Sequence, residues 1–191
     1  MHKTALFFAS LFCAVAAHAG TNNVDIAVAA RRQIGVTVKY NAAYTPIPYP
    51  NGDISRESGV CTDVVIRALR DARKFDLQKH VHEDMRLHFL EYPRDWGLDK
   101  PDRNIDHRRV PNLKCFFTRK GWSRPVTKNP ADYDPGDIVT VTLGRTIPHI
   151  MVVSDRKSPA GRPMIVHNIG SGVKEEDVLF AFTITGHFRM K

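Results

Sequence analysis

The central segment of the chain reads Ser58-Gly59-Val60-Cys61-Thr62-Asp63-Val64-Val65-Ile66-Arg67-Ala68-Leu69. Its apolar residues recur at the spacing of an amphipathic helix, which predicts that a helix begins at or next to Cys61. Unpaired backbone N–H groups and the helix dipole favour an anion at such a position. We therefore expect a lowered pKa for the Cys61 thiol and a nucleophilic role for this residue.

Two histidines follow in segments with strand patterns. His149 precedes four apolar residues, and His167 lies in the run Ile165-Val166-His167-Asn168. A cysteine at a helix start, followed by a histidine on one strand and a polar residue on the next, is the order of a papain-like nucleophile. This order predicts that His149 carries the proton and that His167 orients the His149 ring. The Cys61 backbone N–H is the expected oxyanion donor. A buried structural role is the alternative for each residue taken alone.

The remainder of the chain divides into helices followed by strands. Helical spacing is predicted for residues 25–34 and 77–89, and residues 113–118 fit a helix or a strand. A proline-rich loop precedes the cysteine helix at residues 44–52, and residues 92–111 are irregular and charged. Short β-rich runs follow at residues 138–143, 150–154, 164–168 and 180–188. We expect an α+β domain in which the nucleophile helix packs on a C-terminal antiparallel sheet.

Residues 1–19 have the pattern of a secretory signal peptide. Lys3 precedes an apolar run, and Ala17-His18-Ala19 is a small-x-small cleavage site before Gly20. We expect export to the periplasm or the medium, and a single catalytic domain over residues 20–191 without an integral membrane segment. A retained N-terminal anchor is the alternative, although the apolar run is short for a bilayer span.

The charge and the cysteine count narrow the class of protein. The formal net charge is +8, and loss of residues 1–19, which contain Lys3 and no acidic residue, lowers it to +7. A basic exported protein can associate with an anionic polymer such as the cell wall. A basic surface without a specific partner explains the charge equally well. The charge is dispersed and no aromatic–basic motif accompanies it, so we expect no nucleic-acid partner.

Only Cys61 and Cys115 remain after removal of the signal peptide, which excludes a small disulfide scaffold. A Cys61–Cys115 bridge is one possibility in an oxidising compartment. The apolar neighbours Phe116 and Phe117 instead predict that Cys115 is a small, buried, unbridged residue.

Several further polar residues are candidates for a role. Arg108 and Arg109 could bind substrate carboxylates through their guanidinium forks, with a solvated charge run or an internal salt bridge as the alternative. Tyr49 either lines the cleft or packs internally. His187 is a competing base. We expect no metal at the cluster His80, His82, Asp84 and His88, because His80 and His82 point to different sides of a helix.

Five motifs carry a resemblance to a known family: Gly59-Val60-Cys61-Thr62-Asp63, Asn104-Ile105-Asp106-His107-Arg108-Arg109, Pro135-Gly136-Asp137-Ile138-Val139, His167-Asn168-Ile169-Gly170 and Thr185-Gly186-His187-Phe188-Arg189. They resemble the YijF-like uncharacterised bacterial domain family. The order of the Cys61 helix, the Pro-Gly-Asp strand and the His149 strand also looks like the NlpC-type papain-like cysteine peptidases, which cut bacterial cell-wall peptides.

This resemblance implies a secreted cysteine hydrolase that cleaves amide bonds of peptidoglycan peptides through a Cys-His-His thioester mechanism. Such an enzyme requires no cofactor, and we expect a monomer. A papain-like acyltransferase or deamidase is the alternative within the same chemistry. A wall-associated binding module without catalysis, in which Cys61 is structural, is the alternative of a different class.

Overall fold

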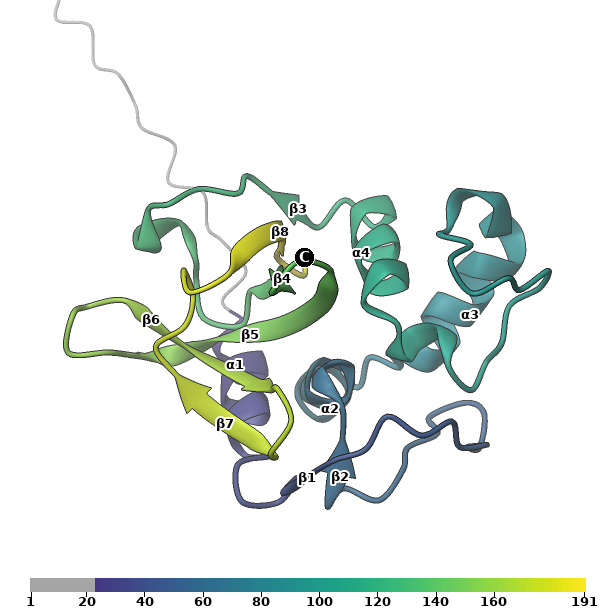
Figure 1. Ribbon diagram of the computed structural model, residues 1–191, viewed down its shortest axis with the longest axis horizontal. Coiled ribbons are helices and arrows are strands. Elements are labelled where there is room, and N and C mark those ends of the chain that lie inside the picture. Colours follow the sequence, from purple (N-terminus) through teal and green to yellow (C-terminus); the bar gives the residue numbers. More distant parts are fainter. Residues whose placement is uncertain (1–22) are drawn as a thin grey trace, which may run out of the picture.

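The computed structural model describes residues 23–191, so the predicted signal peptide at residues 1–19 lies outside the described residues. This part of the chain forms a mixed α+β fold in which helices pack beside a single large sheet (Figure 1). Its four α-helices are α1 (Val24–Arg31), α2 (Cys61–Arg73), α3 (Leu77–His88) and α4 (Val110–Arg119). Short 3-10 helices lie at η1 (Phe89–Glu91), η2 (Asp106–Arg108) and η3 (Pro130–Asp132).

The large sheet has six strands in the order β3-β8-β4-β5-β6-β7, and each neighbouring pair is antiparallel. Its strands are β3 (Ser123–Arg124), β4 (Ile138–Leu143), β5 (Ile147–Lys157), β6 (Pro163–Asn168), β7 (Val173–Glu176) and β8 (Thr183–Phe188). The short strands β1 (Lys39–Tyr40) and β2 (Ser58–Gly59) form a separate parallel pair, which places Tyr40 opposite Gly59. Sequence-distant residues therefore meet immediately before α2.

Side-chain alternation along the strands gives the sheet two apolar faces. Ile150, Val152 and Val166 pack with α1, α2 and α4 in the larger core. Met151 and Ile165 belong to a second cluster on the alternate positions, together with loop residues such as Tyr133 and Leu179. The predicted α+β architecture, with the cysteine helix against an antiparallel sheet, is confirmed.

Helix α2 begins at Cys61 because the preceding backbone is extended and its first amide is capped. Val60 has φ −110° and ψ −176°, and the Asp63 carboxylate accepts the Val60 N–H at 2.7 Å. An acidic side chain in the first turn satisfies an amide and complements the helix dipole. The helix ends at Lys74, which adopts the left-handed conformation with φ 55°. The prediction that Cys61 lies at a helix start is confirmed.

Several element boundaries differ from the predicted ones. Helix α1 ends at Arg31 rather than residue 34, and β5 is longer than the predicted run at residues 150–154. Residues 113–118, predicted as a helix or a strand, are helical within α4. Strand β7 was not predicted, since its sequence Val-Lys-Glu-Glu lacks apolar alternation; pairing with β6 holds it in place. Residues 180–182 form a turn before β8, with the Ala181 N–H bonded to the Val178 carbonyl. Among the described helices, none combines the length and apolarity that a membrane span requires.

Candidate active site

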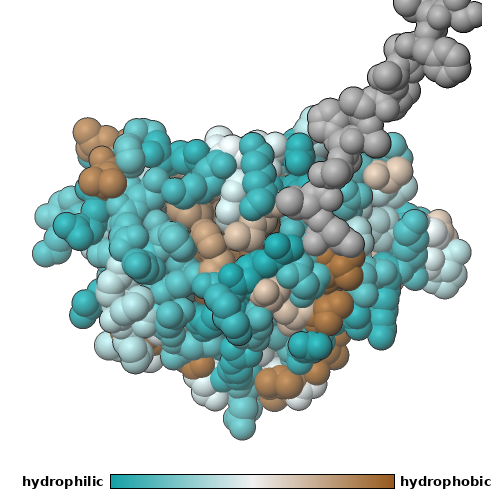
Figure 2. All heavy atoms as spheres, turned by 180° about the vertical axis from the view of Figure 1, so that it is seen from behind, coloured by the Kyte–Doolittle hydropathy of each residue, from teal (hydrophilic) through white to brown (hydrophobic). Residues whose placement is uncertain are grey.

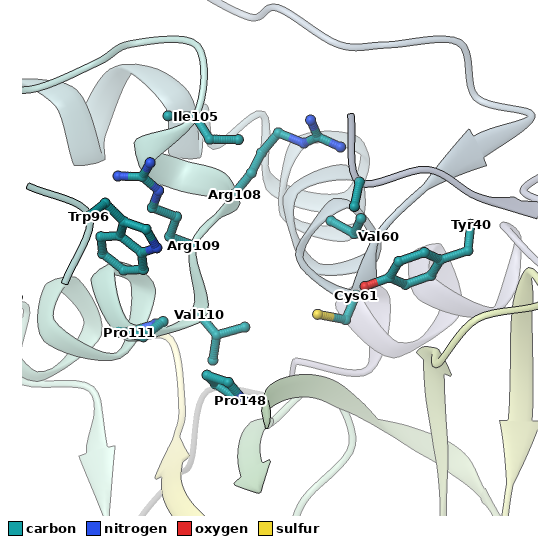
Figure 3. Close-up of a pocket in the computed structure, with 11 residues that line it drawn as sticks. Tyr40, Val60, Cys61, Trp96, Ile105, Arg108, Arg109, Val110, Pro111 and Pro148 are labelled. Carbon is teal, nitrogen blue, oxygen red and sulfur yellow. The ribbon is translucent and has the colours of Figure 1, made fainter. Parts of the chain in front are cut away.

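Cys61 opens into a cavity of about 230 Å³ between the start of α2, the 3-10 segment η2 and the start of β5. Figure 3 shows its sulfur pointing into this cavity towards Val110 and Pro148, with the Tyr40 hydroxyl beside it. The lining residues are Tyr40, Ala42, Val60, Cys61, Trp96, Ile105, Arg108, Arg109, Val110, Pro111 and Pro148. The predicted nucleophile therefore lies in a hollow that a small substrate segment can enter.

The Cys61 sulfur also lies against the backbone of β5. The Ile150 amide, in the peptide bond that links His149 to Ile150, is near enough to Sγ to favour negative charge on the sulfur. The amides of Cys61 and Thr62, at the open end of α2, also favour negative charge on the sulfur. Packing of α2 on β5 thus brings the cysteine next to the histidine predicted to serve as its base.

Burial nevertheless raises the pKa of the Cys61 thiol to about 11, and the Asp63 carboxylate contributes in the same direction. Cys61 is only 6% exposed, so the loss of hydration of a thiolate outweighs the three favourable amides and the helix dipole. The prediction of a lowered thiol pKa is wrong for the free protein. The resting thiol is protonated at neutral pH.

His149 and His167 form a hydrogen-bonded chain that continues to a carboxylate. His149 Nε2 lies 3.1 Å from His167 Nδ1, and His167 Nε2 lies 2.9 Å from Glu176 Oε2. A carboxylate only accepts hydrogen bonds, so His167 donates from Nε2 and, when neutral, accepts at Nδ1. His149 must then donate from Nε2, which leaves a lone pair on its Nδ1. The chain fixes a tautomer in which Nδ1 of His149 can accept a proton.

Both imidazoles are neutral at neutral pH. Burial, together with a smaller contribution from the nearby His167, lowers the pKa of His149 to about 3. Burial also lowers the pKa of His167, although Glu176 partly opposes that shift. Among the described residues, no hydrogen bond joins the Cys61 sulfur to either ring. The structure thus brings His149 and His167 together as predicted, and both rings are neutral, as is the Cys61 thiol.

Arg108 lines the cavity, but its guanidinium is already occupied. Its Nε and Nη2 lie 3.0 Å and 2.9 Å from the two oxygens of Asp63, and further contacts reach the Asn41 and Ala43 carbonyls. Its side chain is 3% exposed, and Figure 3 shows the guanidinium directed away from the Cys61 sulfur. Of the predicted alternatives, the internal salt bridge is therefore the one found for Arg108, not the substrate clamp.

Tyr49 packs internally instead of lining the cavity. Its ring centre lies 5.3 Å from that of His82, and the Arg103 guanidinium lies 5.7 Å above it. Tyr40, and not Tyr49, is the tyrosine that lines the cavity. Burial raises the pKa of Tyr40, and charges on Cys61 and Asp63 add to the shift, so its hydroxyl stays a hydrogen-bond donor.

His187 belongs to a different part of the sheet. Its Nε2 lies 2.7 Å from Asp137 Oδ2, its Nδ1 lies 3.0 Å from the Pro125 carbonyl, and its ring stacks on Tyr133. Both ring nitrogens of His187 already have hydrogen-bond partners, so its surroundings do not support the competing assignment of His187 as the base.

The structure also shows the surroundings of the two cysteines and of the histidine cluster at residues 80–88. Cys61 and Cys115 are both free, which confirms the unbridged prediction, but Cys115 is only half-buried and contacts the Glu91 carbonyl at 3.4 Å. His80 stacks on Phe75. The part of the chain that the structure describes contains no group of three or more residues able to hold a metal ion.

Sequence reasoning missed four residues of the site: Tyr40, Trp96, Asn168 and Glu176. Asn168 donates to the Gly59 carbonyl at 3.0 Å and so ties the end of β6 to the loop before Cys61. The position of Asn168 directly after His167 in the sequence was the signal that could have identified it. Tyr40, Trp96 and Glu176 reach the site through long-range packing, for which the local sequence carries no periodic signal.

Comparison with known proteins places this geometry in a family without an assigned activity. Residues 27–190 match the family model described as a domain of unknown function, DUF1287. The chain is 55% identical over 167 residues to the uncharacterized protein YijF of Escherichia coli (strain K12), with 87% of this chain and 81% of the relative covered. The chain therefore belongs to the DUF1287 family.

Proposed function

We propose that this protein is an exported, papain-like cysteine hydrolase of the NlpC type that cleaves amide bonds in peptidoglycan peptides. One observation carries the proposal: the thiol at the start of α2 contacts the peptide of His149, whose ring is oriented by His167 and Glu176. A cysteine that opens into a cavity, next to the backbone of a histidine whose ring is held by an orienting group, supplies the residue types that nucleophilic catalysis requires.

The proposed reaction begins with a neutral Cys61 thiol and a neutral His149 imidazole. As Cys61 Sγ attacks the substrate carbonyl carbon, its proton moves to Nδ1 of His149 and a tetrahedral intermediate forms. His149 then returns the proton to the departing amine, and the C–N bond breaks to leave a thioester. Water, deprotonated by His149, attacks the thioester and releases the acid and the thiol. Because the resting thiol is protonated, proton transfer accompanies the attack.

Two donors are available to the negative oxygen of the intermediate. The Cys61 N–H lies at the open end of α2, and the Tyr40 hydroxyl lies beside the sulfur (Figure 3). Donors fixed in place before the reaction stabilise developing charge without reorganisation. His167 acts through His149, so it is a positioning residue, and Glu176 is a second one.

The proposed substrate and location rest on the sequence. The signal-peptide pattern of residues 1–19 supports export to the periplasm or medium, and the basic charge supports association with an anionic wall. The likeness of the Cys61, His149 and His167 segments to NlpC-type peptidases supports a cell-wall peptide as substrate. No cofactor enters the proposed chemistry.

The test is digestion of purified wall peptides by the mature protein, with the products weighed by mass spectrometry. Hydrolysis splits a peptide into two fragments whose masses sum to that of the substrate plus one water. Cys61→Ala and His149→Ala should each abolish this product, and the double variant should be no worse than either single one, because the two residues act as a unit.

Graded variants of His167 separate orientation from folding. His167→Asn and His167→Gln keep a hydrogen-bonding group and should retain measurable turnover, whereas His167→Ala should lose more and alter the pH profile. His187→Ala is the matched control, since that buried histidine faces Asp137. Full activity in His149→Ala together with none in folded His187→Ala would refute the assignment. Products that carry an added amine would indicate acyl transfer, and intact peptides would indicate a binding module.

A further inference from the structure

We propose that Arg109, stacked on Trp96, is a carboxylate-binding subsite of the Cys61 cavity, so that the peptide bound there carries a free carboxylate. The inference rests on the proposed function for the identity of the cavity as an active site. Figure 3 places Arg109 and Trp96 together on one side of the cavity, with Cys61 and Tyr40 on the other.

Arg109 is the arginine of this cavity whose donors remain free. Its closest carboxylate, on Asp106, lies 3.7 Å away, which is longer than a hydrogen bond. Among the described residues, none accepts a hydrogen bond from the Arg109 guanidinium. The neighbouring Arg108 differs, since Asp63 and two backbone carbonyls occupy its donors. A charged fork without acceptors at the wall of a cavity is suited to an anionic ligand.

Asp106 does not accept a hydrogen bond from the Arg109 guanidinium. Its Oδ2 accepts the Asp102 amide at 2.5 Å, and its buried Oδ1 has no hydrogen-bond partner. The carboxyl is therefore held by the backbone of its own loop, and it meets Arg109 as an ion pair at 3.7 Å without a hydrogen bond. It approaches the guanidinium closely enough to hold the side chain in place without consuming its donors.

Trp96 makes the arginine rigid. The Arg109 guanidinium carbon lies 4.1 Å from the centre of the Trp96 ring, within the range of a cation–π contact. The Arg109 side chain is 17% exposed and is among the residues that line the cavity. Stacking fixes the plane of the guanidinium before the ligand arrives, which reduces the entropy lost on binding.

The shape of the guanidinium favours a single carboxylate. Asp63 occupies Arg108 through two hydrogen bonds, whereas Arg109 meets Asp106 only as an ion pair at 3.7 Å, so its N–H donors are open to a ligand. A single planar fork matches one carboxylate in two parallel hydrogen bonds. The carboxylate could be an acidic side chain or the C-terminus of a peptide. Both sources present the same group, and the experiment separates them.

The experiment measures binding to full-length mature protein carrying Cys61→Ala, so that cleavage plays no part. Calorimetry would compare Ac-Ala-Glu-NHMe with its neutral isostere Ac-Ala-Gln-NHMe, and Ac-Ala-Ala with a free C-terminus against Ac-Ala-Ala-NHMe. The carboxylate member of at least one pair should bind about tenfold more tightly, the effect of one charge-assisted pair. The pair that shows the preference identifies the source of the carboxylate.

Variants of the subsite then assign the preference to Arg109. Arg109→Gln should abolish it, Arg109→Lys should retain part of it, and Trp96→Ala should weaken it. Arg103→Gln is the matched control, because Arg103 also lies over an aromatic ring, that of Tyr49, but outside the cavity. Circular dichroism would confirm folding, and Arg109→Lys keeps the test valid if Arg109→Gln fails to fold.

Equal affinity for both members of each pair, no detectable binding of either carboxylate at millimolar concentration, or a preference that survives in Arg109→Gln would overturn the subsite. Its failure is distinguishable from failure of the proposed function. Carboxylate binding without cleavage by the wild type would leave the subsite intact and remove the hydrolase. Equal cleavage of acidic and neutral peptides would leave the hydrolase intact and remove the subsite.

Discussion

The buried pair formed by Arg108 and Asp63 should be a major determinant of stability at the candidate site. The two side chains are 3% and 5% exposed, and they meet through two hydrogen bonds. Arg108→Met replaces the guanidinium with an apolar chain of similar length and leaves the Asp63 carboxylate buried without a counter-charge. Breaking a buried pair in this way typically lowers the free energy of unfolding by about 3–5 kcal/mol.

A double variant shows whether the unpaired Asp63 charge is the cause of the lost stability. Asp63→Asn together with Arg108→Met removes both charges, while the amide oxygen can still cap the Val60 N–H. This variant should recover most of the loss, because no uncompensated charge remains. The two single variants and the double variant form a cycle whose coupling energy measures the pair.

Urea denaturation followed by circular dichroism provides the assay, with an unchanged m-value as the condition for comparing variants. Arg162→Met is the matched control, since Arg162 pairs with Asp177 at side-chain exposures of 45% and 26%. This control should lose no more than about 1 kcal/mol. A comparably small loss in Arg108→Met would refute the reasoning, since the pair would then behave as a solvated one.

Three further outcomes test other features of the site. Burial raises the pKa of Asp106 to about 6, against the pull of the Asp102 amide and of Arg109, so the stability it confers is full below its ordinary pKa and falls as pH rises through 6. Asp106→Asn should gain roughly 2 kcal/mol on wild type between pH 4 and pH 7 in urea titrations, and a pH-independent difference would contradict this. In a Cys115→Ala background, alkylation of Cys61 by iodoacetamide should accelerate about tenfold per pH unit from pH 7 to pH 10, whereas a plateau below pH 8 would disprove the raised thiol pKa of about 11. Glu176→Gln should slow wall-peptide cleavage and shift its pH profile with little change in thermal stability, because Glu176 is half-exposed; unchanged kinetics would exclude it from the orienting chain.

The sequence predicted those parts of the fold that depend on local patterns. The apolar spacing after Cys61 is a local property, and so α2 begins where it was expected. The strand patterns around His149 and His167 likewise placed two histidines on neighbouring strands, where they meet. Predicting these features required only the hydrophobic period and the order of the residues along the chain.

The remaining features depend on tertiary packing. The Cys61 pKa was predicted in the wrong direction because the helix dipole follows from sequence, whereas burial beneath β5 does not. Arg108 and Arg109 are adjacent and chemically identical, yet one faces Asp63 and the other faces Trp96. The pairing of β1 with β2 that brings Tyr40 to the thiol links residues 19 positions apart through only two residues in each strand.

The sheet order has a consequence for when the candidate site can form. Strand β8 follows every other strand of this sheet in the sequence, yet it lies inside the sheet between β3 and β4. A chain emerging from the ribosome cannot complete this sheet until residues 183–188 are free. We therefore expect the candidate site to remain unformed until that segment has been made. A chain truncated after residue 178 should accordingly be sensitive to protease, and protease resistance of that fragment would show that the site assembles earlier.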